Sequence, residues 1–305
     1  MSEPGTRYRV GDIVVQPIVE SICTAFDPAS FFPQTTPEDW ARHRPWMLLQ
    51  PHALDPVSGN LVLSIQAFLV RTRHHTILID TCVGDSKPRP HRPFWHLQTF
   101  NTFFPRLAAA GVTPESVDYV MCTHLHHDHV GWNTRLRDGR WVPTFPNARY
   151  IFGREEWEFL QAQHRRVPQP HVNDSVLPVI EAGQVEFVAS DFALDDEVWL
   201  EPTPGHTAGH VSVHLSSRGA EAVITGDCIH SPVQCVEPRW VMRADSDPGV
   251  AQATRLKFLE RYCDRDVLIC ATHFPQPSVG RIVRRAQAFW FDYVSAQTLG
   301  RTSSG

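Results

Sequence analysis

A histidine-rich segment at residues 123–129, Thr-His-Leu-His-His-Asp-His, constrains the fold and chemistry of this chain more than any other feature. It contains the pattern H-x-H-x-D-H and directly follows the apolar run 117–122. Such a crowd of histidine and aspartate is poor material for a core or a helix. Neutral imidazole and carboxylate are, however, preferred ligands of divalent metals, above all zinc. The segment therefore predicts a metal site.

The spacing within this segment indicates two ions rather than one. His124 and His126 are two residues apart, so in a strand-like or loop conformation they point the same way. A helical zinc site would instead space its ligands at i and i+4. Asp128 and His129 form a second pair as the chain turns. Neither pair completes a four-coordinate site, so further ligands must come from elsewhere in the chain.

Three other segments place a histidine or aspartate directly after a strand-like run. His206 follows the run 198–200, Asp227 follows the run 222–225, and His273 follows the run 267–270. Each lies beside glycine or another turn-forming residue. Strand ends that converge on one point are how open α/β sheets build functional sites. We therefore expect these side chains to join the histidine-rich segment.

Taken together, these elements resemble the metallo-β-lactamase superfamily of metal-dependent hydrolases. They run from about residue 60 to 275 in the family's order: Asp80 after the run 76–79, the H-x-H-x-D-H cluster, G-H-T-x-G-H at 205–210, T-G-D at 225–227 and the late His273. The resemblance implies a four-layer αββα sandwich, of the α/β (α+β) class, with the site at one edge.

The resemblance also implies a ligand set for two divalent ions. The first ion would be held by His124, His126 and His206, the second by Asp128, His129 and His273, and Asp227 would bridge them. Zinc is the default for these ligands, although manganese, iron and cobalt suit the same shell. Asp80 is expected to orient a ligand imidazole from outside the ligand set.

Such a centre predicts hydrolysis without a serine or cysteine nucleophile. Two ions can share a hydroxide, because metal binding lowers the pKa of water to about 7. Asp128 could then shuttle a proton, and His230, three residues after Asp227, could act as a proton donor or contact the substrate. The sequence contains no G-x-S-x-G element. We therefore expect cleavage of an ester-like or amide-like bond.

The substrate is less constrained than the chemistry. We see no flavodoxin-like second domain, no inserted nuclease domain, and only a short segment after His273 where a thioesterase of the glyoxalase II type would carry a helical domain. The branch that fits best is that of lactonases, including N-acyl-homoserine-lactone hydrolases, and related carboxylic-ester hydrolases. Two alternatives stay open: a phosphotriesterase or phosphodiesterase with the same ions, and a non-catalytic metal-binding regulatory protein.

Composition excludes some partners and suggests a location. The net charge of -5 argues against nucleic acid as a ligand. There is no run of 18 apolar residues and no N-terminal signal pattern. The seven scattered cysteines are interpreted as reduced, with Cys228 as a buried neighbour of Asp227. We expect a cytoplasmic enzyme acting on a small molecule, without membrane attachment, in which a homodimer is plausible.

The chain is expected to form a single domain over residues 1–305, with a frayed tail at 296–305. Helices are predicted at 96–110, 154–163 and 248–262, and strands at 10–19, 62–70, 76–80, 147–152, 185–189, 211–215 and 222–225. Two long irregular segments, 24–59 and 84–105, are expected near the site, where their aromatic residues could line a substrate pocket, form a dimer surface or belong to a satellite core. Four aromatic residues are weak candidates for the wall of a substrate pocket: Phe26, Trp46, Trp95 and Trp132, of which Trp132 is the best placed.

Overall fold

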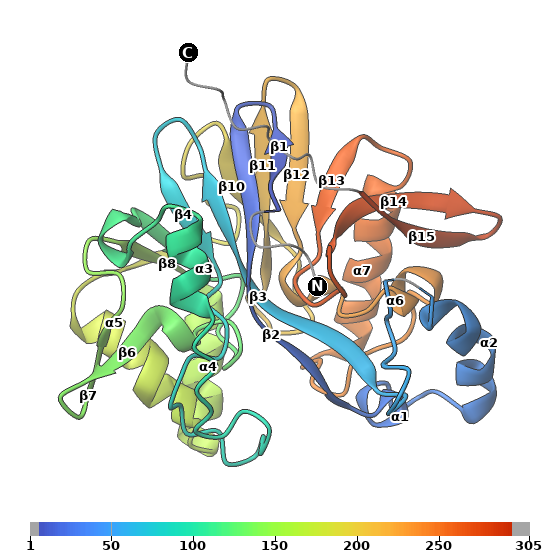
Figure 1. The fold of residues 1–305 in the computed structure, drawn as a ribbon, viewed down its shortest axis with the longest axis horizontal. Helices are drawn as coiled ribbons and strands as arrows, with labels where there is room; N and C mark the ends of the chain where they lie inside the picture. The colour runs from blue at the N-terminus through green and yellow to red at the C-terminus, as the bar shows by residue number, and fades with distance from the viewer. Residues whose placement is uncertain (1–5, 50, 295–305) are drawn as a thin grey trace.

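Two β-sheets lie face to face at the centre of the molecule (Figure 1). The computed structural model describes residues 6–49 and 51–294. The first sheet has the strand order β1-β2-β3-β4-β5-β8-β9, and the second runs from β10 to β15 in chain order. The strands of the first sheet are β1 (Tyr8–Val10), β2 (Ile13–Phe26), β3 (Leu61–Arg71), β4 (Thr76–Ile79), β5 (Tyr119–Met121), β8 (Arg149–Gly153) and β9 (Val185–Val188).

The second sheet mixes antiparallel pairs with one parallel pair, β12 with β13. Its strands are β10 (Val198–Pro202), β11 (Val211–Ser217), β12 (Ala220–Ile224), β13 (Val267–Cys270), β14 (Val279–Arg285) and β15 (Ala288–Tyr293). A separate hairpin joins β6 (Thr134–Arg137) to β7 (Arg140–Pro143).

Alternation along the strands explains why the sheets pack on both faces. Ile77 and Ile79 of β4 belong to the core between the sheets, while Leu78 belongs to the core on the outer face. In β12, Ile224 likewise points between the sheets and Val223 points outward. Successive side chains of a strand point to opposite faces, so each sheet needs a second apolar layer to cover it.

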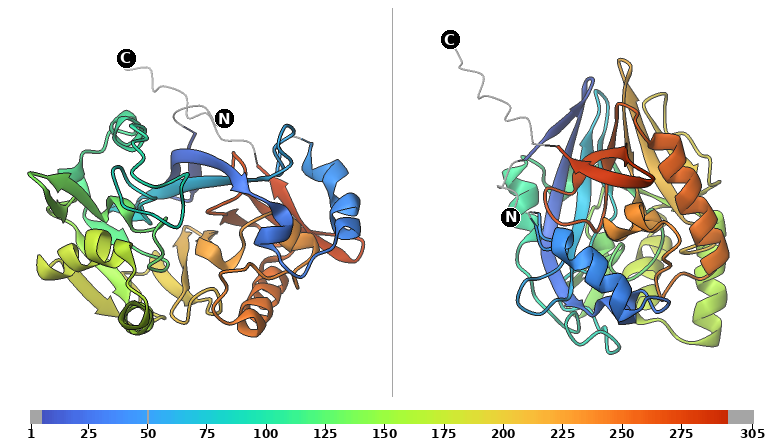
Figure 2. Two further views of the ribbon diagram at one scale, coloured as in Figure 1. Left: turned by 90° about the horizontal axis from the view of Figure 1, so that it is seen from below. Right: turned by 90° about the vertical axis from the view of Figure 1, so that its right-hand side faces the viewer.

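Helices supply these outer layers. The first sheet is covered by α3 (Phe103–Ala109), α4 (Arg154–Arg166) and α5 (Leu177–Glu181), through Leu107, Leu160 and Val179. The second sheet is covered by α7 (Pro248–Tyr262), through Phe258 and Leu259 (Figure 2). The order helix, sheet, sheet, helix confirms the predicted αββα sandwich. None of the described helices combines the length and hydropathy of a membrane span.

Two of the three predicted helices are present nearly as predicted. Residues 248–262 form α7 as predicted, and the helix predicted at 154–163 continues to Arg166. The helix predicted at 96–110 is wrong in its first half, because α3 begins only at Phe103. Leu97 and Asn101 both have φ of 55°, in the left-handed region, so the backbone before Phe103 cannot be helical.

Two strand predictions also needed correction. The strand predicted at 10–19 is interrupted by a turn at Gly11, and β2 then continues to Phe26. Gly11 has φ of 59°, and a Cβ there would lie 2.1 Å from the Ser217 carbonyl oxygen, so only glycine fits. The hairpin β14–β15 was not predicted, since its turn at residues 286–287 lacks the usual glycine or asparagine.

The segment 24–59 is less irregular than predicted. It contains α1 (Pro28–Phe31) and α2 (Pro37–Met47), the latter starting with a capping box between Thr36 and Asp39. Pro45 hides the helical pattern, because proline inside a helix is unfavourable. A last short helix, α6, spans Val233–Val236. The tail at 296–305 lies outside the described residues, and the single-domain assignment stays a prediction.

The N-cap of α7 provides a test of how this outer layer is held. The Asp247 side chain accepts a hydrogen bond from the Val250 backbone N–H at 3.0 Å. We expect Asp247→Ala to lower the free energy of unfolding by about 1 kcal/mol, because it leaves that N–H without its cap. Asp247→Ser should retain most of the stability. Urea denaturation of the three proteins measures the effect, and equal midpoints would contradict it.

Candidate metal centre

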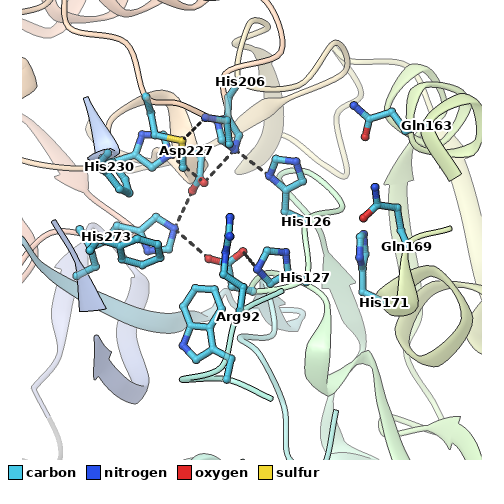
Figure 3. A pocket seen from close by; sticks show the side chains of 17 residues that line it. Arg92, His126, His127, Gln163, Gln169, His171, His206, Asp227, His230 and His273 are labelled. Atoms are coloured by element: carbon cyan, nitrogen blue, oxygen red, sulfur yellow. Dashed lines mark hydrogen bonds and ion pairs between the residues drawn. The ribbon is translucent and has the colours of Figure 1, made fainter. Parts of the chain in front are cut away.

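The two sheets bring the histidine-rich segment and the other predicted ligands together at one edge. The segment 123–129 follows β5, and Asp80 follows the neighbouring parallel strand β4. On the second sheet, the loops after β10, β12 and β13 carry His206, Asp227 and His273. In Figure 3, His126, His206, Asp227 and His273 line one pocket. Sites at the carboxyl ends of strands are characteristic of α/β sheets.

The first group of side chains has the composition of a metal site. It consists of His124, His126, His206 and Asp227. His126 Nδ1 lies 3.0 Å from His124 Nε2 and 2.9 Å from His206 Nε2. Asp227 Oδ2 lies 3.2 Å from His206 Nε2 and 3.7 Å from His124 Nε2. Four potential ligand atoms thus converge on one point.

The second group lies on the other side of Asp227. It consists of Asp128, His129 and His273. Asp227 Oδ1 lies 3.1 Å from His129 Nε2 and 3.0 Å from His273 Nε2. Asp128 Oδ2 lies 4.0 Å from His129 Nε2 and 3.9 Å from His273 Nε2. The two carboxylate oxygens of Asp227 therefore face different groups.

The spacing of these nitrogen and oxygen atoms suits the coordination of divalent ions. Ligand atoms around a tetrahedral zinc ion lie about 3.3 Å apart, given Zn–N distances of about 2.0–2.1 Å. The ring nitrogens of His129 and His273 are 3.2 Å apart, close to that spacing. Asp227 Oδ1 is buried and forms no hydrogen bond of acceptable geometry. A buried carboxylate oxygen in this state needs a cation, so the residues present fit a dinuclear centre.

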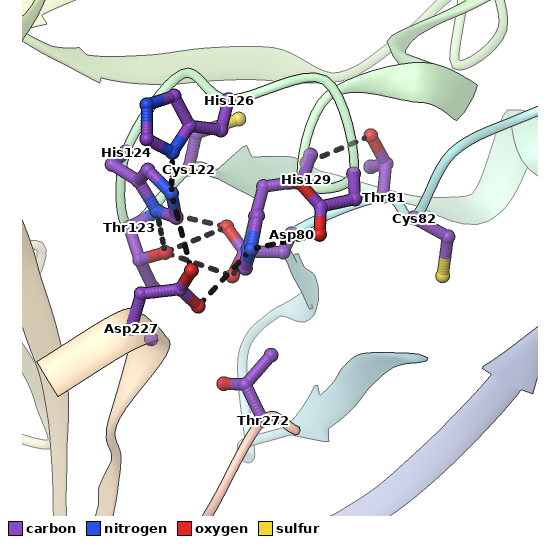
Figure 4. Close-up of polar contacts among 12 residues, drawn as sticks. Asp80, Thr81, Cys82, Cys122, Thr123, His124, His126, His129, Asp227 and Thr272 are labelled. Atoms are coloured by element: carbon purple, nitrogen blue, oxygen red, sulfur yellow. Dashed lines mark hydrogen bonds and ion pairs between the residues drawn. The ribbon is translucent and has the colours of Figure 1, made fainter. Parts of the chain in front are cut away.

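The outer ring nitrogens of three histidines are held by further groups. Asp80 Oδ2 lies 2.9 Å from His129 Nδ1 (Figure 4), and Asp245 Oδ1 lies 2.9 Å from His206 Nδ1. The Ser64 carbonyl oxygen lies 2.9 Å from His273 Nδ1. Such contacts fix the ring orientation and leave Nε2 free to bind an ion. Asp80 was predicted in this place, whereas Asp245 belongs to no motif and was missed.

The electrostatics of the groups favour cation binding. Burial lowers the pKa of His124 and His126 well below the usual histidine range, so both rings are neutral. Burial opposes a charge on His206 as well, but Asp227 and Asp245 outweigh it and raise the pKa of His206 to about 9. The surrounding imidazoles hold the pKa of Asp227 well below its usual range, against the effect of burial. Metal binding here should therefore release protons.

Three further residues of the sequence analysis lie close to these groups. His230 lines the pocket, with Nε2 at 3.1 Å from Asp227 Oδ2 and with Nδ1 unpartnered. His127 belongs to neither group, and its partly buried ring lines the pocket. Cys228 is buried beside Asp227, and burial raises the pKa of its thiol to about 12. It is therefore a thiol rather than a thiolate ligand.

The aromatic candidates separate into two sets. Phe26 and Trp95 line the pocket beside the metal groups. Trp132, expected to be the best placed, lies in the core, where it stacks on Phe103 and donates a hydrogen bond to Glu20. Its backbone follows His129 closely, but the side chain turns to the opposite side. Trp46 lines a different hollow. Proximity in sequence was therefore misleading for Trp132.

The remaining walls of the pocket were not predicted. They come from separate segments that carry no motif, and they include Phe31, Leu63, Arg92, Gln163, Gln169, His171 and Met242. Only the two long segments 24–59 and 84–105 gave any signal, because their length suggested functional loops. Phe31 belongs to the first of them, and Arg92 and Trp95 belong to the second.

The fold and site define a metal-dependent hydrolase. The sequence model of the "Metallo-beta-lactamase superfamily" matches residues 61–273, well over half of the chain. The chain therefore belongs to the metallo-β-lactamase superfamily, as the motifs predicted.

Similar proteins include enzymes of several specificities. An N-acyl homoserine lactonase of Bacillus cereus is 27% identical over 211 residues, which cover 65% of this chain and 78% of that protein. A hydroxyacylglutathione hydrolase of Shewanella denitrificans is 24% identical over 196 residues, covering 61% and 63% of the two chains.

Solved structures share the architecture over nearly the whole chain. The hydrolase AbOPH superposes with a TM-score of 0.78 at 25% identity, covering 96% of this chain and 98% of that one. The dizinc quorum-quenching lactonase AidC superposes with a TM-score of 0.74 at 20% identity, covering 95% and 97%. At this identity the second likeness concerns the fold alone.

The position of Asp227 leads to a prediction about metal content. Because its two oxygens face both groups, Asp227→Ala should reduce the protein from two bound ions per chain to one or none. Elemental analysis after metal loading and dialysis measures the content. Asp191→Ala, at an exposed position, is the matched control. Undiminished loading of the Asp227 variant would rule out a bridging role.

Asp80 permits a cleaner substitution, because its backbone has φ of 60°, a conformation that asparagine also tolerates. Asp80→Asn keeps the shape but removes the charge that holds His129 Nδ1. We expect metal affinity to fall about 10–100-fold. Competition with a chromophoric chelator gives the affinity, and thermal melting checks that the variant is folded. An unchanged affinity would show that the Asp80 charge does not support the centre.

Proposed function

We propose that this protein is a dinuclear-metal hydrolase of lactones or related carboxylic esters, of the N-acyl-homoserine-lactone type. The observation that carries the proposal is the Asp227 carboxylate, whose two oxygens face two separate groups of ligands on the floor of a pocket. The similarity to an N-acyl homoserine lactonase supports the choice of substrate class. Zinc is the proposed metal, because imidazole and carboxylate are its usual ligands.

The pocket above the ligand groups suits a small organic substrate. Its cavity volume is about 190 Å³, and its lining combines apolar with polar side chains, as small-molecule sites do. Phe26, Phe31, Leu63 and Trp95 form an apolar side of the pocket. Phe26 makes edge-to-face contacts with Phe31 and Trp95, at centroid distances of 5.3 and 5.9 Å. This surface can cover the apolar part of an ester while the carbonyl reaches the ligand groups.

The chemistry requires an activated water and a place for the proton. When bound, two divalent ions polarise the substrate carbonyl and lower the pKa of a water molecule to about 7. Asp128 lies at the pocket and is ionised, because His127 and His129 hold its pKa well below the usual range despite burial. Its Oδ2 can accept the proton of the attacking water and donate it to the leaving alkoxide.

His230 contributes in a second way. Burial lowers its pKa, so the ring is neutral, and one nitrogen contacts the Asp227 carboxylate. The other nitrogen, Nδ1, is buried without a hydrogen-bond partner. We therefore assign His230 to orienting Asp227 and to contacting the substrate. The ring packs edge-on against Phe31 and parallel to His273, which keeps it in place.

Location and assembly are also proposals. The seven cysteines are free thiols, which fits a reducing compartment such as the cytoplasm. A homodimer is proposed as the assembly, to be checked by light scattering.

A substrate panel tests the proposed function. Initial rates of the metal-loaded protein should be measured on γ-lactones of increasing acyl length, aryl esters, phosphotriesters and a β-lactam. We expect turnover of the lactones and esters, lost on addition of a chelator and restored by zinc. Rates should rise with acyl length if the apolar side of the pocket binds the chain.

The role of Asp128 leads to a mutational prediction. Asp128→Asn should lower kcat by about 10²–10⁴-fold, because proton transfer contributes that much to hydrolysis.

The substrate panel also distinguishes the alternatives. A preference for phosphotriesters would replace the ester assignment with a phosphotriesterase using the same residues. Tight binding of two ions without turnover of any substrate would instead support a non-catalytic metal-binding protein.

A further inference from the structure

One side of the pocket is polar and takes no part in the metal groups. Gln163, Gln169 and His171 form it and lie in a row in Figure 3, and Arg92 enters the pocket next to His127. We call these four residues the polar wall. Gln163 comes from α4, Gln169 and His171 from the segment that follows it, and Arg92 from the loop 84–105. No sequence motif covers any of them.

His171 is the least explained member of the polar wall. It is 5% exposed and lines the pocket, yet its Nε2 is buried without a hydrogen-bond partner. Burial lowers the pKa of this ring well below the usual histidine range, so it is a neutral hydrogen-bonding group. A π-helix, Val172–Val176, begins directly after it, and such helices frequently mark functional sites. A buried polar atom without a protein partner is satisfied by a ligand or by water.

Arg92 gives the polar wall its charge. Apart from Asp128 and Asp227, it is the one acidic or basic side chain, histidines excepted, among the described residues of the pocket lining. No carboxylate of the described residues forms an ion pair with it. Its guanidinium donates a hydrogen bond to the His91 carbonyl oxygen, at 3.3 Å from Nη1. The other N–H groups of the guanidinium remain available to a ligand.

A buried ion pair holds the two halves of the polar wall together. Arg89 forms two hydrogen bonds with Asp174, Nη1 to Oδ2 at 2.7 Å and Nη2 to Oδ1 at 3.1 Å. Both side chains are only 3% exposed. Arg89 lies three residues before Arg92, and Asp174 lies three residues after His171. The pair therefore fixes the loop 84–105 to the π-helix and gives the polar wall its shape before any ligand binds.

Resting on the proposed function, we propose that the polar wall binds a carboxylate that the substrate carries away from its scissile ester or lactone bond. One guanidinium among uncharged amide and imidazole donors matches a single negative charge, whereas a phosphate dianion favours several cations. A purely aliphatic acyl chain would cover these donors without satisfying them, at a cost in affinity. The substrate class is therefore an ester or lactone with an acidic group.

Matched substrates test this proposal by kinetics. Each pair consists of an aryl ester whose acyl chain ends in a carboxylate and the same compound with that end blocked as a methyl ester. For wild type we expect kcat/KM to favour the acid, mainly through KM. Arg92→Gln should lower kcat/KM for the acid about 10–100-fold, as expected for a hydrogen bond to a charged group, and change the blocked ester little.

Two further variants serve as controls in this experiment. Arg92→Lys keeps the charge and should restore part of the preference for the acid. Arg137→Gln removes an exposed arginine from β6, away from the pocket lining, and should change neither substrate. Thermal melting confirms that each variant is folded. Equal rates for acid and blocked ester in wild type, or an equal loss for both in Arg92→Gln, would overturn the proposal.

A binding experiment separates this proposal from the proposed function. Calorimetry of the zinc-loaded protein with linear dicarboxylates of increasing length, and with their half methyl esters, needs no turnover. We expect one chain length to bind at least about tenfold more tightly than its half ester, an advantage lost in Arg92→Gln. If no ester is hydrolysed but this advantage is found, the polar wall stands and the hydrolase assignment fails. If esters are hydrolysed and no dicarboxylate shows the advantage, the proposed role of the polar wall is refuted and the hydrolase assignment stands.

Discussion

The placement of one buried carboxylate, that of Asp227, is the constraint on which the rest of the site depends. Its oxygens lie 3.0–3.2 Å from ring nitrogens of His129, His206 and His273. These histidines come from both sheets, so the carboxylate joins two halves of the molecule. A buried charge is costly unless it is paired, and here the pairing is complete only with cations. Under our proposal, metal binding and the sandwich would therefore stabilise each other.

The sandwich positions these groups through the core between its sheets. Met121 of β5 and Ile224 of β12 both belong to this core, and each lies a few residues before ligands of the centre. The packing of the two sheets against each other thus determines how far His124 lies from Asp227. Asp80 adds a link within the first sheet, since it contacts both Thr123 and His129. Loops anchored directly at strand ends thus set the geometry of the candidate ligands.

How much of the fold and of the candidate site could be predicted depends on whether the sequence signal lies within one short stretch of the chain. The candidate ligands stand in short motifs directly after apolar strands, so chemistry and spacing together predict that they lie close together, as they do. The walls of the pocket have weaker signals. The segments that carry His171 and Arg92 are joined by the ion pair of Arg89 with Asp174, 85 positions apart, and no pattern along the chain encodes that. Trp132 shows that closeness in sequence does not suffice either. It lies three residues after His129, but its side chain packs in the core.

The same division between centre and walls explains how one fold serves many substrates. The candidate ligands stand on loops directly after strand ends that the sandwich keeps fixed, whereas the polar part of the walls comes from α4, the residues before the π-helix and the loop 84–105, outside both sheets. These segments can change without disturbing the register of the sheets. Under our proposal, an arginine and an unpartnered imidazole in the pocket lining select the substrate and leave the chemistry of the centre unchanged. Specificity in this protein should accordingly be sought in the contacts that fix the loop 84–105 to the π-helix.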